Sequence, residues 1–424
     1  MSFKDKRFFV DKRKMHEGIL YFKRWAYSLM GYAVIAFYIN NLCQTYFPDG
    51  HVKWSKYDTS TESLRLDRRH LDSSDLDGLK NYVNLEKLDL HQNQISDLAP
   101  VSGLANLTEL HLNENQISDL ASISGLANLT ELYLSENQIS DLTPISGLTQ
   151  LTRLELHGNQ VSDISVLSGL VNLKVLDLGN NQVSDLSALA GLANLKDLTL
   201  SGNQVEDLSP LSGLTNMLGL DLSENQVSDL SPISGLTNLI ALYFNVNQVS
   251  DLSPISELTN LNRLYLRGNK ASDLSPLSGF TKLTKLNLND NLVTDLSPIK
   301  GLPDLRVLTL ANNSVSDYTI VLSFPELAAL NLSNNEISDL SQLSGLSETY
   351  GFHELYLADN NIIDISPLSA FRNIILLDLD NNQISDFSPL HNSGIGKLFI
   401  RGNPYSSKEL RALHKALRGC NIAE

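Results

Sequence analysis

The sequence is poor in the residues that many protein classes require. Its 424 residues include two cysteines, Cys43 and Cys420, at opposite ends of the chain, which excludes a disulfide-rich fold. Only 32 basic residues accompany 48 acidic ones, so no nucleic-acid ligand is expected. The sequence lacks G-x-x-x-x-G-K-S/T, G-x-S-x-G, H-E-x-x-H and C-x-x-C motifs. These absences argue against an enzyme, and we expect neither a cofactor nor a bound metal.

What the chain does contain is a repeat. The phrase L-x-x-L-x-L-x-x-N-x-I/V-x-D-L-x-P-L-x-x-L-x-N restarts at a 22-residue step from Leu85 to Leu327, and three looser copies follow from Phe352. A degenerate copy around Leu64 precedes the series. A period this short predicts a solenoid, in which each coil buries its apolar edge by stacking on its neighbours. We therefore expect one solenoid over residues 61–404, made of one degenerate coil and fifteen repeats.

The L-x-L of each coil predicts a short strand with one face in the core, because successive side chains of a strand point in opposite directions. The whole phrase resembles the leucine-rich repeat. Its 22-residue form with D-L-S-P-L is most similar to bacterial internalin-type repeats and to a regulatory subunit of protein phosphatase 1. This resemblance implies an α/β solenoid with a concave parallel sheet, short 3₁₀ or helical turns on the convex side, and a partner bound on the concave side. The lack of cysteine-rich caps favours a bacterial or intracellular protein.

The ninth position of every repeat is asparagine. The chain turns inward there and removes backbone groups from water, and an amide side chain can both donate to and accept from such groups. We predict a structural ladder formed by Asn93, Asn115, Asn137, Asn159, Asn181, Asn203, Asn225, Asn247, Asn269, Asn291, Asn313, Asn335, Asn360, Asn382 and Asn403.

Fourteen aspartates form a second column, from Asp97 to Asp386. A ladder of calcium ions is one explanation, but each coil offers a single repeated carboxylate and lacks the spacing that supplies several oxygens per ion. We favour aspartates that accept backbone N–H bonds where the convex turn begins. Ser-Pro pairs such as Ser209-Pro210 follow, and they predict a serine cap with proline in the first helical turn.

The first 60 residues differ in kind from the repeats. Residues 1–24 form a basic segment, residues 25–48 carry no charge, and residues 49–60 link them to the solenoid. A basic flank before an uncharged stretch with aromatic edges predicts a single-pass membrane anchor with its N-terminus in the cytoplasm. The apolar core is shorter than the ~20 residues that a spanning helix requires. An N-terminal cap of the solenoid and a cleaved signal therefore remain alternatives.

Residues 405–424 predict a C-terminal helix. Ser407 suits the cap position, Leu410, Leu413 and Leu417 share one face at helical spacing, and Gly419 ends the pattern. We expect this helix to cover the exposed apolar end of the last coil, because terminal repeats need a cap. Recruitment of a partner by the helix is the alternative.

Function is expected at the outward-facing strand positions, where the sign of the charge changes along the sheet. The first half is acidic and the middle combines arginine with tyrosine, two residue types that dominate protein interfaces; any exposed sheet could show such residues by chance. His91, His111 and His157 could in principle bind zinc, but they are spread over several coils, so we expect no zinc site. We predict partner contacts by Tyr243, Arg263, Tyr265, Arg267, Lys285, Glu109, Glu131, Tyr133 and Glu155.

Together these features predict a non-catalytic protein-binding solenoid tethered to a bacterial membrane or envelope. The alternative is a cytoplasmic regulatory subunit or scaffold that docks on an enzyme such as a protein phosphatase.

Overall fold

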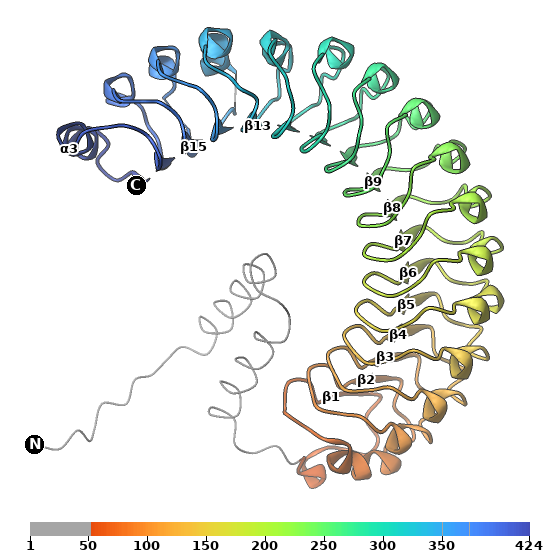
Figure 1. Ribbon diagram of the computed structural model, residues 1–424. Coiled ribbons are helices and arrows are strands. Elements are labelled where there is room, and N and C mark those ends of the chain that lie inside the picture. Colours follow the sequence, from red (N-terminus) through yellow and green to blue (C-terminus); the bar gives the residue numbers. More distant parts are fainter. Residues whose placement is uncertain (1–51, 350, 373) are drawn as a thin grey trace, which may run out of the picture.

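The computed structural model describes residues 52–349, 351–372 and 374–424, which form an open arc of stacked coils (Figure 1). Each coil places a three-residue strand on the inner side of the arc and a short helical turn on the outer side (Figure 1). The predicted solenoid, with its concave parallel sheet, convex 3₁₀ turns and C-terminal helix, is confirmed.

The strands pair in parallel and in chain order, so that a residue lies beside the residue 22 positions later through most of the sheet. Leu110, for example, is aligned with Leu132. The outward-facing residues of successive strands therefore form continuous rows across the concave face. The strands are β1 (Ser63–Arg65), β2 (Lys87–Asp89), β3 (Glu109–His111), β4 (Glu131–Tyr133), β5 (Arg153–Glu155), β6 (Val175–Asp177), β7 (Asp197–Thr199), β8 (Gly219–Asp221), β9 (Ala241–Tyr243), β10 (Arg263–Tyr265), β11 (Lys285–Asn287), β12 (Val307–Thr309), β13 (Ala329–Asn331), β14 (Glu354–Tyr356), β15 (Leu376–Asp378), β16 (Lys397–Phe399) and β17 (Asn421–Ala423).

The central residue of each repeat strand points into one continuous core. In β3, Leu110 is fully buried, whereas Glu109 and His111 on either side of it face outward and are half-buried. The other leucines of the phrase join the same cluster, which runs through the whole solenoid. Removing this apolar surface from water stabilises the fold by about 25 cal/mol for each Å², and it is the main force that stacks the coils.

Most outer turns begin two residues after an aspartate of the predicted column. The Asp207 Oδ1 atom accepts the Ser209 N–H at 2.8 Å, and the equivalent bond occurs at all fourteen aspartates. The predicted serine cap is wrong: the cap residue of this turn is Leu208, and Ser209 is its first helical residue. Asp207, two positions before Ser209, already accepts a hydrogen bond from an N–H group of the first turn, which is the role of a capping side chain.

The outer turns are short because only a few residues separate the aspartate from the next buried leucine. They are η1 (Trp54–Lys56), η2 (Ser73–Asn81), η3 (Ala99–Val101), η4 (Ala121–Ile123), η5 (Thr143–Ile145), η6 (Ser165–Gly169), η7 (Ser187–Leu189), η8 (Ser209–Leu211), η9 (Ser231–Ile233), η10 (Ser253–Ile255), η11 (Ser275–Leu277), η12 (Ser297–Ile299), η13 (Thr319–Ser323), η14 (Ser341–Glu348), η15 (Ser366–Ala370) and η16 (Ser388–Leu390).

Each asparagine of the ninth position connects two coils. The Asn203 amide donates to the Leu200 carbonyl of its own coil at 3.0 Å and to the Leu178 carbonyl of the preceding coil at 2.9 Å, and its oxygen accepts the Val183 N–H at 2.9 Å. The other fourteen repeat this pattern, as Asn159 and Asn269 illustrate. One side chain per coil therefore satisfies backbone groups that the inward turn would otherwise leave unpaired.

Different residues close the two ends of the arc. At the N-terminal end, the Trp54 ring lies 5.4 Å from the Tyr82 ring and so close to Gly78 that a Cβ there would overlap it. At the C-terminal end, α3 (Ser407–Ala416) buries Leu413 against the core, and its cap is Ser406 rather than the predicted Ser407. The chain then adds β17 to the sheet, a strand that the repeat pattern did not predict.

The predicted single-pass membrane topology is contradicted. In the described parts of the chain, no helix is long and apolar enough to cross a membrane. The longest α-helix there, α3, has 10 residues, against the ~20 that a bilayer requires. Residues 25–48, on which the prediction rested, lie outside the described residues.

Candidate functional site

The concave face presents two rows of outward-pointing side chains, because the first and third residues of every strand flank a buried leucine. We call these the first row and the third row. Strand pairing aligns each member with its counterpart in the next coil, as Arg263 with Lys285 and Tyr265 with Asn287. Neighbours within a row are thus about 4.8 Å apart, close enough for their charges to interact directly.

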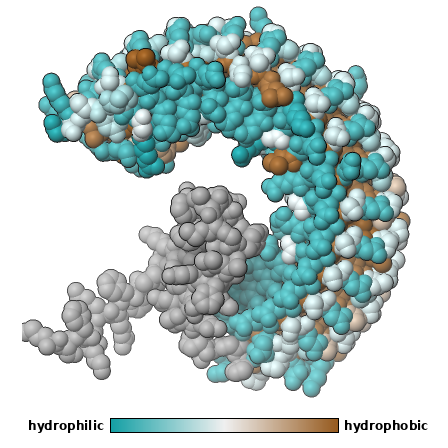
Figure 2. All heavy atoms as spheres, viewed as in Figure 1, coloured by the Kyte–Doolittle hydropathy of each residue, from teal (hydrophilic) through white to brown (hydrophobic). Residues whose placement is uncertain are grey.

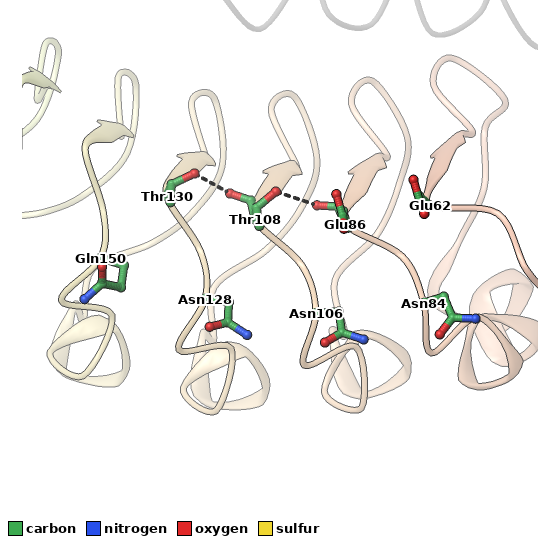
Figure 3. A pocket seen from close by; sticks show the side chains of 8 residues that line it. All are labelled: Glu62, Asn84, Glu86, Asn106, Thr108, Asn128, Thr130 and Gln150. Atoms are coloured by element: carbon green, nitrogen blue, oxygen red, sulfur yellow. Dashed lines mark hydrogen bonds between the residues drawn. The ribbon is translucent and has the colours of Figure 1, made fainter.

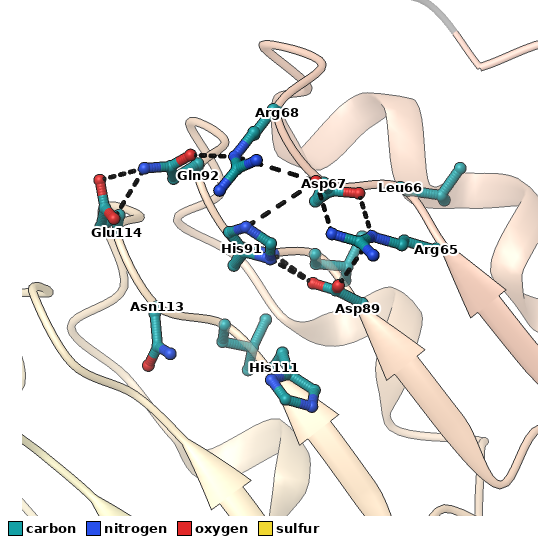
Figure 4. A network of polar contacts seen from close by, with 12 residues as sticks. Arg65, Leu66, Asp67, Arg68, Asp89, His91, Gln92, His111, Asn113 and Glu114 are labelled. Atoms are coloured by element: carbon teal, nitrogen blue, oxygen red, sulfur yellow. Dashed lines mark hydrogen bonds and ion pairs between the residues drawn. The ribbon is translucent and has the colours of Figure 1, made fainter. Parts of the chain in front are cut away.

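Near the N-terminal end, the charged side chains of these rows and of the following loops pair with one another. The Arg65 guanidinium lies 2.7 Å from Asp67 and 3.3 Å from Asp89, and Asp89 in turn lies 2.6 Å from the His91 ring (Figure 4). Arg68 extends the network, because it donates to Gln92 (Figure 4). The charges of this network are therefore largely compensated before any partner arrives.

The predicted acidic contacts lie in the next three strands, and each already has a partner. Glu109 lies 2.6 Å from Lys87 and 2.7 Å from His111. The His111 ring stacks on Tyr133 with centroids 4.1 Å apart, and the Tyr133 hydroxyl donates to Glu131 at 2.5 Å. Glu155 pairs with Arg153 at 2.7 Å. The hydrogen bond from His111, followed by that from Lys87, lowers the pKa of Glu109. We call this set the paired region: Arg65, Asp67, Lys87, Asp89, His91, Glu109, His111, Glu131, Tyr133, Arg153 and Glu155.

The three histidines considered as zinc ligands do not converge. His91 and His111 contact different carboxylates, and His157 lies 3.8 Å from both Glu136 and Asp177. Across the described residues, no three His, Cys, Asp or Glu side chains are placed to hold a metal ion. The interaction with Asp177 makes the largest contribution to raising the pKa of His157. The ring has room because residue 179 is glycine, whose Cβ would lie 2.6 Å from the His157 Nδ1 atom.

The middle of the concave face has a different arrangement, in which acidic and basic side chains are separated. Along the first row, Asp197 is aligned with Gly219, Gly219 with Ala241, Ala241 with Arg263, and Arg263 with Lys285. Along the third row, Asp221 is followed by two tyrosines whose ring centroids lie 5.0 Å apart. We call this surface the central patch: Asp197, Gly219, Asp221, Ala241, Tyr243, Arg263, Tyr265 and Lys285.

The charged ends of the central patch have no counter-ion within the described protein. Arg263 and Lys285 are exposed neighbours of like charge, and neither they nor Asp197 and Asp221 form an ion pair with any described residue. Burial raises the pKa of Asp221. Arg267, which was predicted to join the patch, instead lies beyond β10 and pairs with Asp290 at 2.6 Å. Of the predicted cationic contacts, Arg263 and Lys285 therefore form no ion pair among the described residues.

Exposed apolar side chains flank the two tyrosines. Ile240 is 47% exposed and Val246 is 51% exposed, one on each side of β9. Val246 also has a φ of 54°, a left-handed conformation that is unfavourable for a β-branched residue. Figure 2 shows a mainly hydrophilic inner rim with a hydrophobic spot near the middle of the arc. These are the side chains that a partner could cover with a gain in apolar burial.

A polar groove of about 590 Å³ lies on the flank of the first coils (Figure 3). Its side chains hold neighbouring coils together: Thr108 donates to the Glu86 carbonyl at 3.1 Å, and Asn106 donates to the Val83 carbonyl at 3.0 Å. Asn106 belongs to a second asparagine row, which corresponds to the last position of the repeat phrase and was not among the predicted structural residues. The row comprises Asn106, Asn128, Asn172, Asn194, Asn216, Asn238 and Asn260.

Comparison with known proteins defines the class to which this fold belongs. A model of two consecutive leucine-rich repeats matches most of the solenoid, and these matches together span more than half of the chain. The chain therefore belongs to the leucine-rich repeat family, whose members typically serve as protein interaction modules. No curated protein matches the sequence. The matched segments are residues 83–127, 105–148, 127–169, 149–191, 193–235, 215–257, 237–279, 281–321 and 353–392.

Solved structures similar to this chain include an internalin. The chain is 34% identical to the internalin InlF of Listeria monocytogenes, with a TM-score of 0.68, over 72% of this chain and 89% of that one. A leucine-rich repeat protein of Leptospira interrogans is 25% identical, with a TM-score of 0.66, over 86% and 90% of the two chains. The ectodomain of an Arabidopsis thaliana receptor kinase, GASSHO1/SCHENGEN3, shares the fold at 22% identity and a TM-score of 0.63, over 86% and 50%. The predicted internalin-like repeat is confirmed.

Proposed function

We propose that this protein is a non-catalytic module that binds a protein partner through the central patch of its concave face. The observation that carries the proposal is the alignment of two cations without ion pairs, Arg263 and Lys285, beside two neighbouring tyrosine rings. Like charges aligned on neighbouring strands destabilise a sheet, so folding does not explain them. A partner that neutralises the cations and covers the tyrosines does, because arginine and tyrosine contribute most of the energy at such contacts.

The charge of the chain favours a protein partner over a nucleic acid. The whole chain has a formal net charge of −16, which opposes the approach of a nucleic acid. Among structures of the same fold, the GASSHO1/SCHENGEN3 ectodomain was solved in complex with Casparian strip integrity factor 2. These points support a protein partner.

The test is capture of partners from a lysate by the full chain and by two variants of equal charge change. Arg263→Glu with Lys285→Glu reverses the cationic end of the patch. Lys282→Glu with Lys300→Glu makes the same change outside the concave face, where both lysines are exposed. Loss of interface hot spots typically costs about 2–4 kcal/mol, so the first variant should lose the captured protein, which mass spectrometry identifies and quantifies.

The control variant should retain that protein, and both variants should keep the circular dichroism spectrum and melting temperature of the wild type. Undiminished capture by the first variant would contradict the proposal. The site would then move to Glu109, Glu131, Tyr133 and Glu155, the predicted contacts in the paired region.

A further inference from the structure

The two charged ends of the central patch are a fixed distance apart. In the first row, Asp197 and Arg263 are separated by the strands that carry Gly219 and Ala241. Three strand spacings correspond to about 14 Å. Between the ends, the first row has no side chain longer than a methyl group, so this part of the sheet surface is low and uncharged.

The acidic end leans toward this low strip. The Asp197 Oδ1 atom lies 2.8 Å from the position that a Cβ on Gly219 would occupy. The carboxylate therefore reaches over Gly219, toward the basic end. In the third row, Asp221 and Tyr243 border the strip, and Tyr265 follows on the strand that carries Arg263. Exposed Ile240 immediately precedes Ala241.

We infer that the central patch binds an extended segment of a partner protein, in which a basic and an acidic residue stand four positions apart with an apolar residue midway. An extended chain advances about 3.3 Å per residue, and its alternate side chains point the same way. Residues i, i+2 and i+4 of such a segment span about 13 Å on one face. The basic residue meets Asp197 and Asp221, the apolar residue covers Gly219 and Ala241, and the acidic residue meets Arg263 and Lys285. The inference rests on the proposed function and specifies its ligand.

Other occupants fit this geometry less well. In an α-helix, 14 Å corresponds to nine or ten residues, which places the two charges on different sides of the helix axis. A uniformly acidic protein surface would be attracted by Arg263 and Lys285 but repelled by Asp197 and Asp221. A segment with separated charges of both signs is complementary to both ends at once.

The test is selection of a displayed library of random 12-residue peptides on the full-length protein. We expect enrichment of peptides with a basic and an acidic residue four positions apart around an apolar residue, in one or both chain directions. With Arg263→Glu and Lys285→Glu, the acidic residue of the motif should be replaced by a basic one. With Asp197→Lys, the basic residue should be replaced by an acidic one. The Lys282→Glu, Lys300→Glu control should select the wild-type motif.

The spacing is tested with one selected peptide, synthesised with a fluorophore and titrated by anisotropy. Lengthening the interval between the charges by one residue should weaken binding roughly tenfold or more, because it turns one charge away from the sheet. Gly219→Leu should weaken binding comparably, because its side chain fills the strip. The added Cβ of this variant meets only the flexible tip of Asp197, and an unchanged circular dichroism spectrum verifies the fold.

The outcomes separate the inference from the proposed function. Enriched peptides that bind all central-patch variants equally, but fail on Glu109→Lys or Glu155→Lys variants, would overturn the inference and retain concave-face binding elsewhere. Peptides that depend on Arg263 and Lys285 but show no charge spacing would overturn the inference and retain the proposed site. Enrichment no greater than on an unrelated protein would contradict both.

Discussion

The paired region and the central patch are built on the same backbone, yet they place their charges in opposite ways. In the paired region, Lys87 lies 2.6 Å from Glu109 on the next strand, so these two opposite charges compensate each other. In the central patch, Lys285 occupies the same strand position as Lys87 but lies beside Arg263. The row and the residue type are the same, but Lys87 has an opposite charge on the following strand and Lys285 has a like charge on the preceding one.

This contrast separates charges that are compensated within the fold from charges that are not. Ion pairs across neighbouring strands add a little stability, and like charges in the same place subtract a similar amount. The backbone, the leucine core and the asparagine ladder are the same in both regions and tolerate either arrangement. On a repeat sheet, paired charges therefore mark the part of the face whose charges are already neutralised. Separated charges mark the part whose charges can still pair with those of a partner.

The largest effect is expected from the ladder, and it should be equal in the two regions. Asn159→Ala and Asn269→Ala each remove a buried amide that bonds two coils. Each should cost about 1–3 kcal/mol, because inward-facing backbone groups lose their partners. Urea denaturation followed by circular dichroism measures the cost.

Each ladder variant has a neighbouring control. Gln160→Ala and Lys270→Ala alter the next, exposed residue of the same coil and should change stability by less than about 0.5 kcal/mol. If ladder and control variants unfolded at the same urea concentration, the structural role of these asparagines would be refuted.

A smaller effect with opposite signs distinguishes the two regions directly. Lys87→Leu removes a pair with Glu109 whose lysine is mostly exposed, so it should cost only about 0.2–1 kcal/mol. Lys285→Leu removes a like charge aligned with Arg263 on the neighbouring strand and should leave the melting temperature unchanged or raise it. Repeating both melts in high salt should shrink the difference. Equal losses in the two variants would show that the charge arrangement does not separate the regions.

The smallest effect concerns His157, which lies between the two regions. Asp177 contributes most to raising its pKa above 6.5, and Glu136 and Glu155 add to it. The protonated ring therefore stabilises the fold, a contribution that is complete below the unfolded pKa and is lost as the pH rises through the raised folded value. His157→Gln should flatten the decline of the melting temperature as the pH rises above about 6.5. Asp177→Asn should do the same, and an unaltered pH profile in both would rule out this role.

The repeat period was sufficient to predict the sheet, the outer turns and the aspartate bonds, because each follows from a residue type repeated at fixed spacing. The serine cap was predicted wrongly because only the backbone geometry shows that the helical turn begins at Ser209, which places Leu208 at the cap position. The strand β17 falls outside the repeat and carries no leucine phrase, so periodicity could not reveal it.

The candidate site was only partly predictable. Pairs such as Lys87 with Glu109 could have been found, because residues 22 positions apart are neighbours throughout the regular coils. The partner of Arg267 could not, because Asp290 lies 23 positions away, in a loop, and is reached through a side-chain conformation. Gly219 gave no signal in the sequence, since its importance lies in the space that it leaves to Asp197.

The constant coil length makes the concave face an array whose columns can be added or removed without disturbing the others. Deletion of residues 220–241 would join Gly219 to Leu242 and restore a complete strand from the remains of β8 and β9. Asp197 and Arg263 would then stand two columns apart instead of three. The distance between opposite charges that such a protein recognises is thus counted in whole coils, and loss or duplication of a 22-residue unit changes it in steps of about 4.8 Å.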